Sequence, residues 1–220
     1  MWKKCKKAVI ELFFPTECFF CKKAGSFLCE DCAALLDITQ SHRPERANKY
    51  LDDIYAAGNY ENKYLKRIIA AFKYEPFLKS LGMPLAKLIA DHFSLTQIPP
   101  DRAAVIVPVP LAGKRMRWRG YNQSQVIARE LGLLWQIPVF ANTLSRRHNT
   151  KTQAELGKNE RVKNVKGAFV CNTPAEIKNK VVYLLDDVVT TGATMEECAK
   201  VLKHNGAAQV IGLAIARTEI

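Results

Sequence analysis

The strongest constraint on the fold is an alternation of short apolar runs and helical patterns in the second half of the chain. Two segments, 122–135 and 195–204, repeat apolar residues at the three- and four-residue spacing of one helix face. The apolar runs are 103–110, 168–171, 181–185 and 210–216. Because strands buried on both faces read as nearly continuous apolar runs, the pattern predicts an α/β fold with a parallel sheet covered by helices on both sides.

Further elements are expected upstream of this region and within it. A strand is predicted over 54–60, followed by helices over 62–74 and 77–93. Another strand is predicted over 139–144. The basic segment 111–124 is interpreted as a loop that leaves the first strand of the alternating region.

The chain is long enough, at 220 residues, to bury a substantial core, and a boundary is expected near residue 45. We predict a small N-terminal module with its connector over 1–45 and the parallel-sheet domain over 46–220. The start of the chain is basic like a signal peptide, but Glu11 interrupts the apolar run that follows, so the protein is interpreted as cytoplasmic. No apolar stretch approaches the roughly 20 residues that a membrane span requires.

The chain is strongly basic, with 33 lysines and arginines against 21 acidic residues and a net charge of +12. Such a field attracts phosphate groups, either on a small metabolite or along a nucleic acid. Charge alone does not decide between these two ligands.

Four cysteines form two C-x-x-C pairs, Cys18 with Cys21 and Cys29 with Cys32. Each pair can place two thiolates on one tight turn, and two such turns complete a tetrahedral shell for a structural Zn²⁺ ion. A redox or disulfide role is the alternative, which the reducing conditions of a cytoplasm disfavour.

A pair of carboxylates, Asp186 and Asp187, directly follows the apolar run 181–185. In a parallel sheet, ligands bind beyond the carboxyl ends of the strands, where this pair would lie. The next residues, Thr190, Thr191, Gly192, Ala193 and Thr194, lead into a predicted helix. Hydroxyl groups, a glycine and a helix N-terminus together suit a phosphate group.

Carboxylates repel phosphate, so the acids must contact a different part of the same ligand. Two adjacent acceptors suit a vicinal diol such as the hydroxyls of a ribose, and the whole pattern therefore suits a ribose 5-phosphate. The alternative is an acidic strand end followed by a turn that only caps a helix. Neither G-x-x-x-x-G-K-[ST] nor G-x-G-x-x-G occurs in the chain, which argues against Walker-type and Rossmann-type nucleotide sites.

The stretch V-Y-L-L-D-D-V-V-T-T-G-A-T resembles the motif with which type I phosphoribosyltransferases bind phosphoribosyl pyrophosphate (PRPP). The resemblance implies that Asp186 and Asp187 hold the ribose hydroxyls and act in catalysis, and that residues 190–194 hold the 5-phosphate. PRPP also carries a pyrophosphate group, normally bound to Mg²⁺, which requires cations. Lys114 and Arg115 are the candidates for that contact.

Arg117 and Arg119 lie in the same basic cluster and leave three interpretations open. They could contact pyrophosphate, form a solvated surface, or bind the phosphates of a single-stranded nucleic acid. The polar segment 145–164 is interpreted as a lid that closes over PRPP and brings Arg147 and Lys151 to the pyrophosphate, or else as an exposed connector.

Several motifs together resemble the ComF/GntX family of bacterial competence-associated proteins. They are the two cysteine pairs, Ile69-A-A-F-K-Tyr74, Val107-P-V-P-Leu111, Arg119-G-Y-N-Q-Ser124, Arg146-R-H-N-T-K-T-Gln153 and the acid-pair motif, in this order along nearly the whole chain. The resemblance implies a zinc finger joined to a phosphoribosyltransferase-like domain, with a role in natural transformation and DNA uptake alongside other competence proteins. Two functions stay open: a PRPP-binding protein that transfers ribose 5-phosphate or uses the ligand as a signal, and a single-stranded nucleic-acid adaptor whose PRPP site is regulatory or idle. The sequence does not indicate an acceptor or an oligomeric state.

Overall fold

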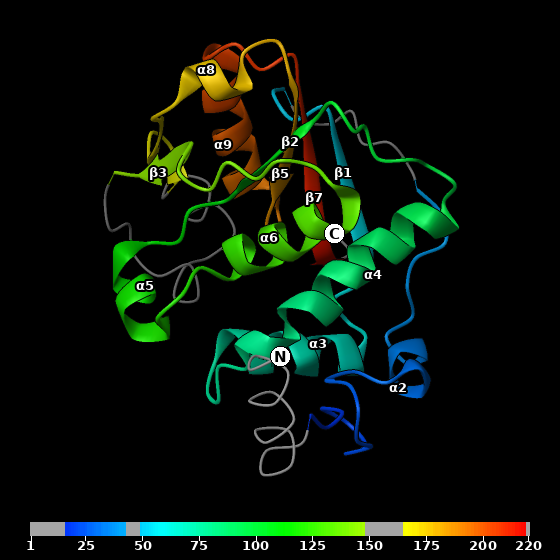
Figure 1. The fold of residues 1–220 in the computed structure, drawn as a ribbon. Helices are drawn as coiled ribbons and strands as arrows, with labels where there is room; N and C mark the ends of the chain where they lie inside the picture. The colour runs from blue at the N-terminus through cyan, green and yellow to red at the C-terminus, as the bar shows by residue number, and fades with distance from the viewer. Residues whose placement is uncertain (1–15, 43–48, 148–164, 219–220) are drawn as a thin grey trace, which may run out of the picture.

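The structure is a computed structural model, and it describes residues 16–42, 49–147 and 165–218 (Figure 1). The centre is a five-stranded sheet in which β1 (Asp53–Asn59), β7 (Gln209–Arg217), β5 (Val181–Leu185) and β2 (Val105–Pro108) are neighbours in this order. The short strand β6 (Val188–Val189) also pairs with β7. All these pairings are parallel, which confirms the predicted fold class.

Helices cover both faces of the sheet because the side chains of each strand alternate between two hydrophobic cores. One core joins Ile106 and Leu185 to α3 (Lys63–Lys73), α4 (Gly82–Leu95) and α6 (Gln123–Trp135). The other joins Val105 and Leu184 to α9 (Ala193–His204). This arrangement leaves the carboxyl ends of β2 and β5 together at one edge of the sheet, in parallel register.

Asparagines fix the starts of two helices that reach this edge. The side chain of Asn62 accepts hydrogen bonds from the backbone N–H groups of Tyr64 and Leu65 and begins α3. Asn122 accepts from the N–H of Ser124 and also donates from Nδ2 to the carbonyl of Val109, 3.0 Å away. Asn122 therefore connects the start of α6 to the residue that follows β2.

Several of the predicted elements differ from the structure. The segment 111–124 is not a loop throughout, because α5 (Gly113–Arg119) forms within it and ends at Gly120, whose φ of 77° is left-handed. The helix predicted over 77–93 begins only at Gly82, after the 3₁₀ turn η1 (Lys79–Leu81). In place of the strand predicted over 139–144, Val139 forms an isolated bridge with Ile106, and only the last residue, Leu144, belongs to a strand, β3.

The remaining elements form a small peripheral unit. Strand β3 (Leu144–Arg146) pairs antiparallel with β4 (Phe169–Cys171), and the short helix α8 (Pro174–Ile177) follows. The apolar run 168–171 therefore lies outside the main sheet, contrary to the prediction, because its three strand residues pair only with β3.

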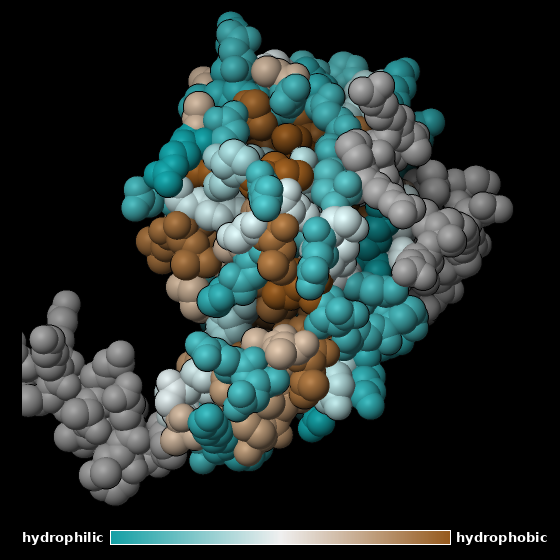
Figure 2. Space-filling model, turned by 90° about the vertical axis from the view of Figure 1, so that its right-hand side faces the viewer, coloured by the Kyte–Doolittle hydropathy of each residue, from teal (hydrophilic) through white to brown (hydrophobic). Residues whose placement is uncertain are grey.

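The cysteine-rich segment 16–42 contains α2 (Glu30–Ala34) and lies at the base of the molecule. An isolated antiparallel bridge joins Ile38 to Gly58 in β1, and this segment appears as the lower lobe in Figure 2. Hydrophobic surface continues from the main body into that lobe (Figure 2). The predicted domain boundary near residue 45 falls within 43–48, outside the described residues.

Over the described ranges, no helix combines the length and the apolar character needed to cross a bilayer.

Candidate functional site

A pocket of about 540 Å³ opens at the carboxyl edge of the sheet, where β2 and β5 end. The acid pair, the loop 190–194 and the basic helix α5 all contribute to its wall. Its lining includes Asp186, Asp187, Thr190, Thr191, Gly192, Ala193, Thr194, Lys114, Arg115 and Arg119. Segments that are distant in the sequence are therefore brought to one cavity.

The two carboxylates are held differently. Asp186 Oδ1 accepts hydrogen bonds from the Ser124 hydroxyl and from the N–H of Asp187, both at 2.9 Å. Asp187 is buried; its Oδ1 accepts from the N–H of Val188 at 2.6 Å, and its Oδ2 has no hydrogen-bond partner among the described residues. The side chains are thus fixed by the backbone turn and by α6 before any ligand arrives.

Burial, together with the neighbouring Asp187 charge, raises the pKa of Asp186 to about 7, and Lys73 only partly offsets this. The carboxyl group of Asp186 therefore changes its charge near neutral pH. A ligand that supplies donors or a cation would favour its ionised form.

Lys73, the last residue of α3, places Nζ 2.8 Å from Asp187 Oδ1, and both side chains are largely buried. Burial opposes the charge of Lys73, but the Asp187 carboxylate outweighs it, so the pKa of Lys73 lies above its ordinary value. Lys73 therefore stays protonated at neutral pH. The sequence predicted no functional role for Lys73, although this residue lies in the Ile69–Tyr74 motif.

The loop after the acids turns directly into α9. Gly192 has a left-handed φ of 73° and stands at the N-cap position, and its carbonyl accepts from the N–H of Glu196. The N–H of Ala193 lies 3.4 Å from Thr191 Oγ1. The loop therefore presents hydroxyl groups and the start of a 12-residue helix to the pocket, an arrangement that suits an anion.

The basic residues of α5 differ in whether they line the pocket. Lys114, Arg115 and Arg119 line the pocket, whereas Arg117 is exposed on α5 away from the lining. Arg119 is only 7% exposed, its Nε and Nη1 have no hydrogen-bond partner among the described residues, and burial lowers its pKa. Its burial places it in the pocket rather than on an outer surface open to a nucleic acid.

Arg146 and Arg147 are adjacent in the sequence but differ in their position relative to the pocket. Arg146 at the end of β3 lines the pocket, although no role was predicted for it from the sequence. The neighbouring Arg147, predicted to reach the pyrophosphate, is exposed and lies outside the lining. Most of the predicted lid, including Lys151, lies outside the described residues.

Two half-exposed aromatic rings, Tyr74 and Trp118, stand at the same pocket with their centroids 6.1 Å apart. Tyr121, by contrast, is buried and donates its hydroxyl to the carbonyl of Phe72. Tyr121 therefore serves packing between α3 and the start of α6.

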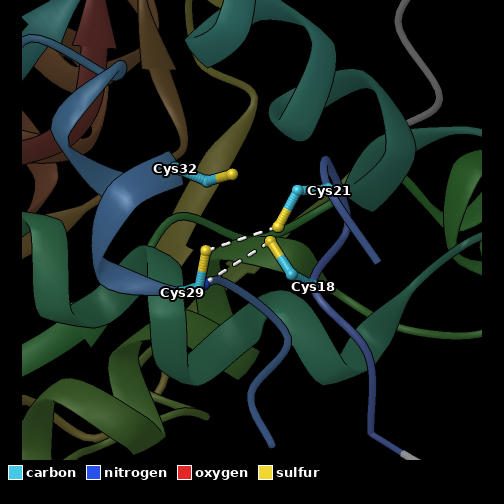
Figure 3. A group of neighbouring side chains, drawn as sticks. All are labelled: Cys18, Cys21, Cys29 and Cys32. Atoms are coloured by element: carbon cyan, nitrogen blue, oxygen red, sulfur yellow. Dashed lines mark hydrogen bonds between the residues drawn. The ribbon is translucent and has the colours of Figure 1, made fainter. Parts of the chain in front are cut away.

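The four predicted ligand cysteines converge in a separate cluster, with their sulfur atoms pointing toward one another (Figure 3). All four Sγ atoms lie within 4.8 Å of one another, and those of Cys21 and Cys29 are 3.6 Å apart. A tetrahedral zinc ion with Zn–S bonds of about 2.3 Å sets its sulfur ligands about 3.8 Å apart, so the cluster fits such an ion. The N–H of Cys29 also points to Cys18 Sγ at 3.5 Å, as N–H groups do around a metal-bound thiolate.

Residues 78–218, which include the pocket's acid pair and phosphate-type loop, match the family model of the phosphoribosyl transferase domain. The match covers more than half of the chain. The chain belongs to the phosphoribosyl transferase domain family.

Curated relatives of this phosphoribosyltransferase-domain protein carry competence and DNA-utilization names. Competence protein F of Haemophilus influenzae is 39% identical over 50% of this chain and 49% of its own length. The DNA utilization protein YhgH of Salmonella typhi is 41% identical, over 63% of this chain and 61% of the relative. Competence protein ComFC of Bacillus subtilis is 29% identical, over 71% and 61%. The chain thus spans about half to three fifths of the length of these relatives, and their names confirm the resemblance to the ComF family.

Solved structures similar to this phosphoribosyltransferase domain include the glutamine PRPP amidotransferase of B. subtilis complexed with ADP and GMP. It is 17% identical, with a TM-score of 0.41, and the similarity covers 61% of this chain and 26% of that chain. A hypoxanthine phosphoribosyltransferase of Staphylococcus aureus is 15% identical over 62% of both chains, with a TM-score of 0.36.

Proposed function

We propose that this protein binds PRPP, together with the Mg²⁺ that accompanies its pyrophosphate, in the pocket at the carboxyl edge of the sheet. The observation that carries the proposal is the joint placement of the acid pair and the loop 190–194 on one cavity. The phosphoribosyl transferase domain match and the competence names of the relatives support it. We further propose a cytoplasmic role in DNA uptake, with residues 1–45 as a zinc module and 46–220 as the PRPP-binding domain.

The parts of PRPP find complementary groups around the pocket. Hydroxyl groups are hydrogen-bond donors, and Asp187 Oδ2 is a buried acceptor without a partner among the described residues, so the acids suit the ribose hydroxyls. The 5-phosphate is assigned to residues 190–194, at the start of α9. Lys114 and Arg115 are assigned to the pyrophosphate, joined by Arg147 and Lys151 if the segment 145–164 closes over the ligand.

The same arrangement would favour breakage of the bond between the ribose and pyrophosphate. In that step pyrophosphate would leave with the bonding electrons and an acceptor nucleophile would bond to the ribose carbon. Asp186 and Asp187 would stabilise the positive charge that develops on the ribose, and the basic side chains would neutralise the pyrophosphate. A bound ligand used as a signal requires the same contacts without this step.

Calorimetric titration with PRPP and Mg²⁺ tests the binding proposal. The wild-type protein should bind and the Asp186→Asn, Asp187→Asn variant should not. Asp91→Asn is the matched control, because Asp91 forms only an exposed ion pair with Lys87 on α4. Equal binding by the wild type and the double variant would refute the assignment, and pyrophosphate release in the presence of candidate acceptors would separate an enzyme from a binding protein.

A second candidate function is binding of single-stranded DNA. The observation that favours it is the exposed side chain of Arg117 on α5, next in the sequence to Trp118, whose ring lines the pocket and is 53% exposed. Paired cations and aromatic rings are the usual elements of single-strand binding. This function and PRPP binding are compatible, because Arg117 does not line the pocket.

A further inference from the structure

Helix α3 connects the cysteine cluster to the pocket, and its first turns contact the cysteine-rich segment. The ring of Tyr64 meets the ring of Phe20 edge-on, with centroids 5.7 Å apart. The guanidinium of Arg67 lies 5.6 Å and 5.7 Å from the ring centroids of Phe19 and Phe20. Phe19 and Phe20 are the two residues between Cys18 and Cys21, so the position of these rings depends on the turn that carries two predicted metal ligands.

The other end of α3 is part of the pocket. Its last residue, Lys73, forms the ion pair with Asp187, and the preceding carbonyl of Phe72 accepts the hydroxyl of Tyr121. Between the two ends, Ile68, Ile69 and Phe72 are fully buried in the core. An 11-residue helix is about 16 Å long, and one packed this tightly moves as a unit rather than bending.

We propose that Lys73 is the positioning residue of the acid pair, and that through α3 it couples metal binding at Cys18, Cys21, Cys29 and Cys32 to the affinity of the pocket for PRPP. This inference rests on the proposed function. A metal ion cross-links the two cysteine turns and fixes Phe19 and Phe20 against the start of α3. Without it, the helix loses that support, and Lys73 holds Asp187 less firmly.

The coupling can be measured as the ratio of PRPP affinities of the zinc-loaded and zinc-free full-length protein, both checked for folding by circular dichroism. In the wild type we expect zinc removal to weaken binding about fivefold or more, the usual lower range for coupled sites. In Lys73→Met, binding should be weaker and the ratio should approach one. Lys87→Met, which removes the exposed lysine of a comparable Lys–Asp pair on α4, should keep the wild-type ratio.

A second variant avoids any dependence on the stability of the zinc-free protein. Phe20→Ala removes the Phe20 ring contacts to Tyr64 and Arg67 and leaves the pocket residues unchanged. Because Phe20 also packs against the cysteine cluster, the comparison uses protein whose metal analysis shows full zinc loading. It should weaken PRPP binding several-fold when residue 73 is lysine and have no effect in the Lys73→Met background.

Linkage supplies an independent readout, because PRPP must tighten zinc binding by the same factor by which zinc tightens PRPP binding. Zinc transfer to a chromogenic chelator should therefore need more chelator when PRPP is present, in the wild type but not in Lys73→Met. A wild-type ratio of one, or equal ratios in the wild type and Lys73→Met, would overturn the coupling. A zinc-loaded wild type that binds no PRPP would instead refute the proposed function itself.

Discussion

We expect the substitution Asp186→Asn to stabilise the folded protein and to abolish PRPP binding. The Asp186 carboxyl is placed beside a second carboxylate, and burial and that charge raise its pKa from 3.8 to about 7. Asparagine has nearly the same shape, and its Oδ1 can accept the hydrogen bonds from Ser124 and from the N–H of Asp187. The substitution therefore removes the charge and keeps these two contacts.

The expected magnitude follows from the two pKa values. A carboxyl group whose pKa is higher in the folded state than in the unfolded state favours folding fully at pH values below the unfolded-state pKa. This contribution to stability is lost as the pH rises through the folded-state pKa. Each pH unit between 3.8 and about 7 changes the free energy of unfolding by about 1.4 kcal/mol, which gives at most about 4 kcal/mol above neutral pH. Because part of Asp186 faces the pocket, water screens its charge, and we expect about 1–3 kcal/mol.

Urea unfolding of the wild type and Asp186→Asn at about pH 5 and about pH 8.5 measures this difference. The variant should be the more stable protein at the higher pH, and its advantage should shrink toward the lower pH. Comparison at each pH cancels the effects of pH on other groups, including the cysteine cluster. An advantage that does not depend on pH, or a variant less stable at the higher pH, would refute the account of the acid pair.

Three other perturbations have defined outcomes. Gly192→Ala places a side chain at a φ of 73° and should cost about 1 kcal/mol of stability and weaken binding of PRPP, whereas unchanged affinity by calorimetry would argue against the loop 190–194 as the phosphate site. Metal analysis should find one zinc per chain, and Cys29→Ser should lower the zinc content and the melting temperature; full zinc retention would contradict the Cys₄ shell. Arg117→Ala should weaken binding of single-stranded DNA and make that binding less dependent on salt concentration. Arg119→Ala, at a buried position in the pocket, should weaken PRPP binding more than DNA binding. The reverse pattern, measured by DNA titration at several salt concentrations and by PRPP calorimetry, would contradict this division.

Much of the fold could be predicted from the sequence because the central strands of the sheet are buried on both faces. Runs such as Val181–Leu185 contain no charged residue and are mostly aliphatic, so their type and position follow from hydrophobic burial. Helix α5 was not predicted because it is short and only Arg119 among its residues is buried, which leaves no apolar periodicity to detect. The segment around Val139 reads as a strand, but its pairing with Ile106 is a single bridge, an outcome that depends on tertiary packing.

The site was predictable where its residues are adjacent in the sequence and not where they are brought together by packing. Asp186, Asp187 and the loop after them form one local motif at a strand end, and they line the pocket as a group. Lys73 reaches Asp187 only because α3 packs across the sheet, and Arg146 enters the lining from a peripheral strand. Both residues lie in motifs that carry the resemblance to the ComF family, but those motifs do not show that the side chains reach the acid pair or the pocket.

A crystal structure of the zinc-loaded protein with PRPP and Mg²⁺ is the most direct test of the proposed site. The account predicts the ribose hydroxyls at the carboxylates of Asp186 and Asp187, the 5-phosphate at residues 190–194, and the pyrophosphate toward Lys114 and Arg115. PRPP bound in another orientation, or at another surface while this pocket stays empty, would contradict the account.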